Sequence, residues 1–207
     1  LLNYDKEIIK DLVEILTQSS IEVCEGQAFD MEFEIRNDVK IEEYINMIRL
    51  KTGVLLSCAL RLGAVTAHCS KENLELLNEF ALNIGIAFQI QDDILDCWSD
   101  VEVFGKITGK DIIDNKKTFL YLKALEIGSE RQQNILKELY SSKNFESTQK
   151  EQVVKSIYEE LKIKELAQKE MQYYHNLALE SLDKIKIDNE RKENLRLFAE
   201  KLMKRNK

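Results

Sequence analysis

Proline is absent from the 207-residue sequence, and glycine occurs only seven times. Average usage would place about ten prolines in a chain of this length. Because proline and glycine interrupt helices most strongly, their scarcity favours long, continuous helices. We therefore predict an all-α fold, with residues 1–207 forming a single helical domain.

Long apolar runs are also absent. No run reaches the roughly 18 residues that a membrane-spanning helix needs, and no signal peptide is visible. The formal net charge is -7, which argues against nucleic acid as the main partner. A hydrophobic fraction of 44% with 32% charged residues is typical of a folded protein. We expect a cytoplasmic protein without a membrane span.

Cysteine and histidine are scarce and show no paired spacing. The four cysteines are Cys24, Cys58, Cys69 and Cys97. Without a CxxC pattern, they are interpreted as small core residues of a reduced, cytosolic protein. The two histidines, His68 and His175, are too isolated to form a zinc site.

The most informative stretch is FQIQDDILD, residues Phe88–Asp96, which sets carboxylates in an otherwise apolar run. In a helix, Asp92 and Asp96 stack on one face, and Gln89 lies one turn earlier on that face. The two carboxylates repel each other unless a cation lies between them, and hard oxygen ligands suit Mg²⁺. Such an ion can bridge the protein and a diphosphate. A solvated acidic helix face is the alternative, which the apolar neighbours disfavour.

A polar connection, DVEVFGKITGKDIIDNKK, follows the acidic stretch from residue 100 to residue 117. Its lysines are Lys106, Lys110, Lys116 and Lys117. Metal-holding acids beside anion-binding lysines are what a phosphorylated substrate requires. An ordinary lysine-rich loop remains the alternative interpretation.

Two upstream segments carry further polar residues on predicted helices. In EGQAFD, Gln27 and Asp30 share a helix face, where a buried pair used only for packing is one interpretation. Lys51 and Thr52 fall in the middle of a second helix, flanked by apolar residues. A buried lysine is costly without an anion, so Lys51 either extends outward or binds phosphate. The Thr52 hydroxyl can donate to the same phosphate oxygen or bond back to its own helix.

Hydrophobic periodicity places these segments on a series of helices. The first helix ends near Glu34, and the second runs from Ile41 to about Ala67. Its predicted inner residues are Ile45, Ile48, Leu55, Ala59 and Leu62. Ser70 is the predicted N-cap of the next helix, which continues into the aspartate motif. Later helices are predicted at 117–127, 130–141, 147–162, 163–186 and 190–204.

These motifs resemble one family of enzymes. FQIQDDILD followed by FGK, GKDI and NKKT is similar to the second aspartate-rich region of the trans-isoprenyl diphosphate synthases, the farnesyl and geranylgeranyl diphosphate synthase family. EGQAFD and MIRLKTGVLL resemble upstream segments of that family in the same order, so the match runs from about Val23 to Leu122. The resemblance implies an isoprenoid-synthase-type bundle of long antiparallel helices around a central cavity, and a homodimer.

The resemblance also implies a chemistry, the Mg²⁺-dependent condensation of an allylic diphosphate with isopentenyl diphosphate. It implies about three Mg²⁺ ions per active site, which neutralise the departing pyrophosphate. The implied metal-binding residues are Asp92, Asp93 and Asp96. The implied contacts to the allylic diphosphate are Lys51, Gln89, Lys106 and Lys116. Thr52, together with Lys51, is implied in stabilising the allylic cation, and Gln27 and Asp30 in lining the substrate cavity.

The sequence departs from this family in one respect. The chain opens with Leu1 in a helical pattern, and the family's first aspartate-rich motif and its arginines do not occur in residues 1–207. We therefore expect the N-terminal helices of the family to be missing from this stretch. We also expect the 207 residues alone to be inactive.

Two other functions remain open from the sequence. One is a non-catalytic partner subunit of a synthase with the same fold, although the intact aspartate motif argues against it. The other is a cyclase-type terpene synthase, which uses similar metal chemistry on a single substrate. The Lys51–Thr52 pair and the lysine-rich connection favour the transferase over the cyclase.

Overall fold

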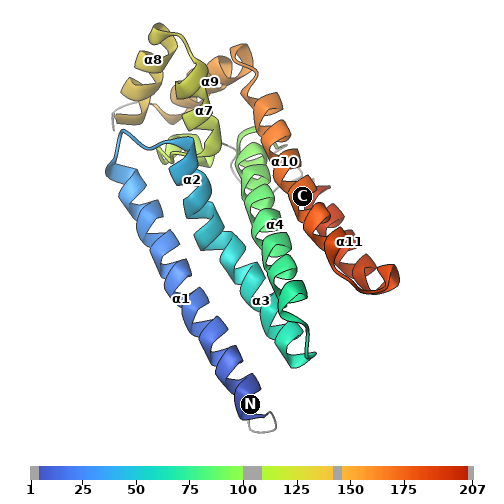
Figure 1. Ribbon diagram of the computed structural model, residues 1–207. Helices are drawn as coiled ribbons and strands as arrows, with labels where there is room; N and C mark the ends of the chain where they lie inside the picture. Colours follow the sequence, from blue (N-terminus) through green and yellow to red (C-terminus); the bar gives the residue numbers. More distant parts are fainter. Residues whose placement is uncertain (1–4, 100–108, 142–145, 205–207) are drawn as a thin grey trace.

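A computed structural model describes residues 5–99, 109–141 and 146–204 of the chain (Figure 1). Within these ranges the regular structure is helical and contains no strand, which confirms the predicted all-α fold. The helices are α1 (Lys6–Ile35), α2 (Ile41–Ile48), the π-helical turn η1 (Arg49–Gly53), α3 (Val54–Thr66), α4 (Lys71–Trp98), α6 (Lys110–Ile113), α7 (Phe119–Ile127), α8 (Glu130–Ser141), α9 (Ser147–Glu160), α10 (Ile163–Lys184) and α11 (Asn189–Met203).

Side-chain caps mark the starts of α1 and α4. The Asp5 carboxylate accepts a hydrogen bond from the Lys6 amide at the start of α1 (2.8 Å). The Ser70 hydroxyl accepts one from the Asn73 amide at the start of α4 (3.3 Å), as predicted. Such caps satisfy amide groups that have no partner within the helix. The Ser70 cap fixes the start of α4, the helix that carries the aspartate motif.

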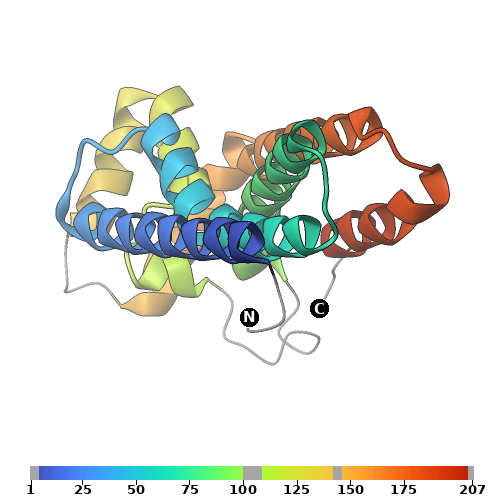
Figure 2. The same cartoon turned by 60° about the horizontal axis from the view of Figure 1, so that its bottom comes forward.

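Helix α4 lies at the centre of the arrangement. It packs against α3 and η1 on one side and along α10 on the other, while α1 packs against α3 and η1. Figure 1 shows these long helices side by side, with α7, α8 and α9 gathered at one end. In Figure 2, α11 folds back beside α10. This arrangement brings the aspartate motif of α4 opposite the Lys51–Thr52 turn.

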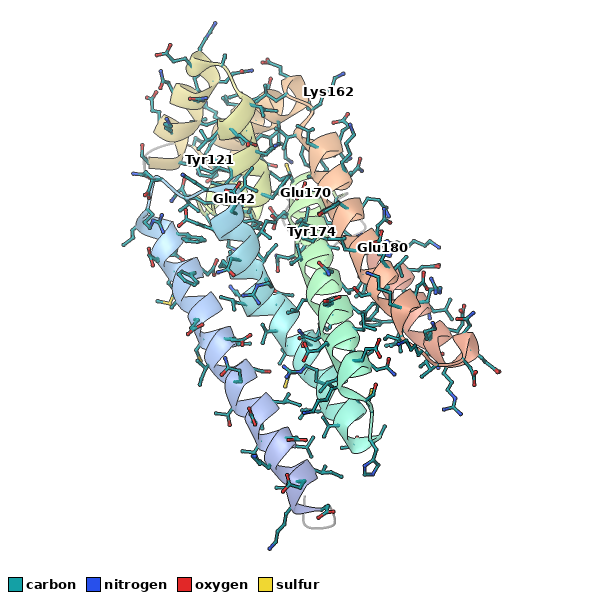
Figure 3. All side chains as sticks on the ribbon, viewed as in Figure 1. Glu42, Tyr121, Lys162, Glu170, Tyr174 and Glu180 are labelled. Atoms are coloured by element: carbon teal, nitrogen blue, oxygen red, sulfur yellow. The ribbon has the colours of Figure 1, made fainter. Side chains whose placement is uncertain are left out.

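Two apolar clusters hold the helices together. The first joins α2, α4 and α7–α10 and includes Ile90, Phe119 and Tyr158, all nearly inaccessible to solvent. Tyr121 of α7, which is labelled in Figure 3, stacks on Tyr140 of α8, with ring centroids 3.9 Å apart. The second cluster joins α4, α10 and α11 and consists of Phe80, Ile84, Ala178, Leu182, Ile185 and Ala199. Burial of each leucine, isoleucine or phenylalanine side chain in these clusters stabilises the folded state by about 1.5–3 kcal/mol.

Beyond Gly53, the predicted inner face of the second long helix is wrong for Leu55 and Ala59, and only Leu62 is partly buried. Leu55 is 63% exposed and Ala59 is exposed, whereas Val54 and Cys58 are buried. The reason is the π-helical turn Arg49–Gly53, which holds an extra residue. One extra residue rotates every later side chain by about 100° relative to a continuous α-helix. A sequence pattern that assumes uninterrupted α-geometry therefore misplaces the downstream residues.

The cysteines are only partly core residues. Cys58 and Cys97 are buried and Cys69 is partly buried, but Cys24 is exposed on α1, where a core position was predicted. All four are free thiols. None of the described helices combines the length and the apolar character that a membrane crossing requires.

Candidate active site

A cavity of about 680 Å³ lies between α1, α2, η1, α4 and the segment that precedes α7. Its wall is strongly charged, with carboxylates and ammonium groups on facing elements. The acidic residues at its surface are Asp30, Glu34, Asp92, Asp93, Asp96 and Asp111. The lysines are Lys51, Lys110, Lys116 and Lys117, and Gln89 and Tyr44 also contribute. Residues from all four predicted segments therefore meet at one site.

Lys51 and Asp30 form an ion pair across this cavity. The Lys51 ammonium lies 2.6 Å from the Asp30 carboxylate, and both side chains are about one-third exposed. Lys51 thus extends to the cavity surface instead of being buried in the core. Gln27 is exposed and does not line the cavity, so the interpretation of Gln27 and Asp30 as a buried packing pair is wrong. A substrate role for Gln27 stays a prediction.

Close backbone contacts hold the π-helical turn that carries Lys51. A Cβ atom added at Gly26 of α1 would lie 2.5 Å from the Lys51 amide nitrogen. A Cβ atom added at Gly85 of α4 would overlap the backbone of Gly53. Only glycine permits backbones to approach this closely. Helices α1 and α4 therefore clamp the turn from two sides.

Thr52 reaches across to the aspartate helix. Its hydroxyl donates a hydrogen bond to the side-chain carbonyl of Gln89 on α4 (3.2 Å). Gln89 lies one helical turn before the aspartate motif, as predicted. The contact links the π-helical turn to the motif and shows that Thr52 does not bond back to its own helix.

Asp92 and Asp96 form the acidic face of α4 at the cavity. Asp92 is exposed and Asp96 is partly buried. The Asp96 carboxylate accepts a hydrogen bond from the Asp111 amide (3.0 Å). Burial, together with the nearby charges of Asp111 and Asp92, raises the pKa of Asp96 to about 6, despite that hydrogen bond. A nearby cation would relieve this accumulation of negative charge.

Asp93 lies deeper than its two neighbours. Its Oδ2 atom accepts hydrogen bonds from the Tyr44 hydroxyl (2.5 Å) and the Phe119 amide (3.2 Å), and the side chain is 3% exposed. Burial raises the pKa of Asp93 to about 8, although these donors oppose the shift. The residue ties α4 to α2 and α7 behind the acidic face. Asp93 as a metal ligand stays a prediction.

The lysines beside the motif have different partners. The Lys116 ammonium pairs with the Asp111 carboxylate (3.0 Å) at the cavity. Burial lowers the pKa of Lys116, but the carboxylates of Asp111, Asp30 and Asp93 outweigh it and raise the pKa overall. Lys117 instead donates to the Phe33 carbonyl (2.7 Å) at the end of α1. Lys106, a predicted diphosphate contact, lies outside the described residues.

The donor set fits Mg²⁺ only in combination with an anion. In the part of the chain that the structure describes, no three His, Cys, Asp or Glu side chains are grouped to hold a metal ion. Asp92 and Asp96 nevertheless supply hard oxygen donors at the cavity surface. Protein-bound Mg²⁺ typically takes one or two carboxylates and completes its shell with water and phosphate oxygens. These residues therefore suit a metal that is held jointly with a diphosphate.

Sequence reasoning missed two residues of the site. Asp111 could have been noticed, because it is a carboxylate inside the lysine-rich connection and within the GKDI motif. Tyr44 gave no signal, because it lies 49 residues from Asp93 in the sequence and resembles an ordinary core aromatic residue. Only the packing of α2 on α4 reveals its contact.

The fold and the site together define an all-α protein of the isoprenoid-synthase class. The chain belongs to the polyprenyl synthetase family, whose model matches residues 1–161.

Its relatives include named synthases. The chain is 42% identical over 158 residues to a short chain isoprenyl diphosphate synthase of Methanocaldococcus jannaschii, a match that covers 76% of this chain and 47% of that protein. It is 38% identical over 181 residues to a geranylgeranyl diphosphate synthase of Sulfolobus acidocaldarius, covering 86% and 54%. The chain thus spans about half the length of these curated relatives.

A solved structure supports the same fold. A crystal structure of geranylgeranyl pyrophosphate synthase superimposes on this chain with a TM-score of 0.91 at 38% identity. The match covers 98% of this chain and 63% of the other. The helices beyond residue 161 therefore also follow the fold of that protein.

Proposed function

We propose that the protein to which these residues belong is a Mg²⁺-dependent prenyltransferase that condenses an allylic diphosphate with isopentenyl diphosphate. The observation that carries the proposal is the single cavity in which Asp92 and Asp96 lie with Lys51, Lys116 and other lysines. Carboxylates that hold a metal and lysines that bind phosphate are both needed to retain a diphosphate. The names of the relatives support the same reaction class.

The residues that bind the diphosphate are Lys51, Lys116 and Gln89. Lys106 is assigned the same role by resemblance to the family alone. Lys51 exchanges its ion pair with Asp30 for a phosphate oxygen, which costs little because the pair is solvent-accessible. Lys116 similarly turns from Asp111 to the ligand. Asp30 and Asp111 thereby keep both lysines at the cavity until the more highly charged diphosphate binds.

Asp92 and Asp96 would hold magnesium on the diphosphate side of the cavity. When bound, magnesium neutralises the negative charge of the departing pyrophosphate. Because the pKa of Asp96 is about 6, its carboxylate is mostly ionised at neutral pH and available as a ligand. Asp93 supports this face through its bonds to Tyr44 and Phe119.

The π-helical turn suits stabilisation of the allylic cation. Fixed dipoles aimed at developing charge are effective because they need no reorganisation during the reaction. We assign this role to the backbone carbonyls and the hydroxyl near Lys51 and Thr52, which the Gly26 and Gly85 contacts hold rigidly. The released pyrophosphate removes the proton from the condensed product, so no side-chain base is assigned.

We propose further that the protein is a cytoplasmic homodimer. Several large apolar side chains of α1 are exposed, among them Leu16 at 54%, Met31 at 63% and Ile35 at 83%. Exposed apolar surface of this kind favours association. Sedimentation velocity should show a dimer, and a monomer at high protein concentration would contradict this part of the proposal.

The experiment that tests the function incubates the protein with Mg²⁺, radiolabelled isopentenyl diphosphate and an allylic diphosphate, followed by product analysis. We propose that residues 1–207 alone are inactive, so the assay also uses a chimera. The chimera joins residues 1–207 to the part of the Methanocaldococcus jannaschii relative that they do not match. A labelled, chain-extended diphosphate supports the transferase. A cyclic product from the allylic substrate alone indicates a cyclase, and no product from either chain indicates a non-catalytic subunit.

A further inference from the structure

Lys150 is a buried lysine on α9 that does not line the cavity. Only 4% of the residue is exposed. Its ammonium donates hydrogen bonds to the Asn115 side-chain carbonyl (2.6 Å) and the Ile113 backbone carbonyl (3.3 Å), and lies 4.8 Å from the centre of the Tyr140 ring. Burial lowers the pKa of Lys150. Because burying an ammonium group is costly, these contacts must offset a substantial desolvation penalty.

The residues that Lys150 contacts belong to a segment with little internal support. Helix α6 is only four residues long, too short to be stable alone. Asn115, which follows it, has a left-handed backbone conformation (φ 59°). The segment therefore depends on contacts with neighbouring helices for its position.

Two such contacts join the segment to α4 and to α9. On the α4 side, the Asp96 carboxylate accepts a hydrogen bond from the Asp111 amide (3.0 Å). On the α9 side, Lys150 binds Ile113 and Asn115. Lys116 comes directly after Asn115, and its amide donates to the Asp111 carbonyl (2.9 Å). The Lys150 contacts thus fall between the two residues whose side chains pair at the cavity.

We propose that Lys150 is a positioning residue for the diphosphate site. By holding Ile113 and Asn115, it fixes the backbone from which Lys116 reaches the cavity, and it does so without touching the ligand. This inference rests on the proposed function in one respect, namely that Lys116 binds a diphosphate.

The first test measures pyrophosphate binding to residues 1–207 by calorimetry in the presence of Mg²⁺. Lys150→Met keeps an apolar stem of similar length and removes the ammonium group. We expect affinity to fall about tenfold, the cost of displacing one charged hydrogen-bond donor. Lys150→Arg, which can donate to both acceptors, should restore most of the affinity. Asn115→Gly tolerates the left-handed conformation and removes one acceptor, so it should weaken binding in the same direction.

Lys192 provides a matched control for loss of a buried lysine. It is also 4% exposed, and its ammonium donates to the Asp183 and Ile185 carbonyls where α10 ends, away from the cavity. Lys192→Met should lower the melting temperature without changing affinity in the folded protein. If Lys192→Met and Lys150→Met reduce affinity equally, the loss reflects general destabilisation, and the positioning role is overturned.

A double variant shows whether Lys150 acts through Lys116. In a Lys116→Met background, Lys150→Met should cause no further loss of affinity, because the group that it positions is already absent. A full additional tenfold loss would overturn the inference.

A ligand-free readout separates this inference from the proposed function. NMR titration of the Lys116 side chain should show its raised pKa returning toward the ordinary lysine value in Lys150→Met, as Lys116 leaves Asp111. An unchanged Lys116 titration would overturn the positioning role whether or not the protein binds pyrophosphate. If the unmodified chain fails to bind pyrophosphate with Mg²⁺ while the Lys116 titration shifts as expected, the proposed function fails and the positioning role stands.

Discussion

Lys51 and Asp30 form an ion pair 2.6 Å long across the cavity, joining the π-helical turn to α1. The pair unites two motifs that lie 21 residues apart in the sequence. It places a cation at the cavity surface with a partner that water can replace. Lys51 is therefore held in position and remains available to a phosphate oxygen.

Replacing Lys51 by methionine should separate binding from stability. Because the pair is partly exposed, its loss should change the free energy of unfolding by less than about 1 kcal/mol. Affinity for pyrophosphate with Mg²⁺ should fall about tenfold. Thermal melting and calorimetry measure the two effects. As a control, Asp30→Asn removes the competing anion and should raise the affinity. Loss of folding in Lys51→Met with unchanged affinity would show that the lysine is structural.

Magnesium binding should depend on an anionic ligand. Asp92 and Asp96 provide only two carboxylates, too few for a tight Mg²⁺ site without phosphate oxygens. Calorimetry should show weak Mg²⁺ binding that strengthens when pyrophosphate or a bisphosphonate is present. The double variant Asp92→Ala, Asp96→Ala should lose this synergy. Tight Mg²⁺ binding to the ligand-free double variant would show that Asp92 and Asp96 are not the magnesium ligands.

Asp93 should make the folded protein less stable as pH rises. Its pKa is about 8 when folded, against an ordinary value of 3.8 for an aspartate, so between these values the folded state binds more protons than the unfolded state. The stabilising contribution of Asp93 is fully present below about pH 4 and is lost as pH rises through about 8. Asp96 acts in the same direction up to about pH 6.

The measurement is the free energy of unfolding by urea between pH 4 and 9, with a chelator present to remove metal ions. Asp93→Asn keeps a hydrogen-bond acceptor for Tyr44 and cannot ionise, so its pH profile should be flatter than that of the unmodified protein. Parallel profiles for the two proteins would show that Asp93 does not titrate in this range.

Gly85 should tolerate no side chain. An added Cβ would meet the backbone of Gly53, which cannot move aside as a flexible side chain can. Gly85→Ala should therefore displace the π-helical turn, lowering stability by about 1–3 kcal/mol and weakening pyrophosphate binding. Gly63→Ala is the matched control, because nothing lies within 4 Å of its added Cβ, and alanine should stabilise that helix by up to about 1 kcal/mol. If the two variants had the same melting temperature and the same affinity for pyrophosphate, Gly85 would not be needed to hold the π-helical turn.

The sequence by itself determined the helical class and most helix bounds, and it predicted most of the polar residues that line the cavity. Absence of proline and a regular apolar period are local properties, so they indicate α4 and α10 without knowledge of packing. The spacing of Asp92 and Asp96 predicts a shared acidic face for the same reason. Ser70 was identifiable as a cap because its side chain bonds within its own helix.

Only the tertiary structure decided which of these residues act together. The π-helical turn lies where Gly26 of α1 and Gly85 of α4 approach its backbone, and Leu55, which follows the turn, is exposed. Asp93 looked like its neighbours until the fold placed Tyr44 and Phe119 against it. Such contacts join residues that are distant in sequence, so no local pattern records them. Their geometry is fixed only when the helices pack, because burial sets both the available partners and the cost of leaving a charge without one.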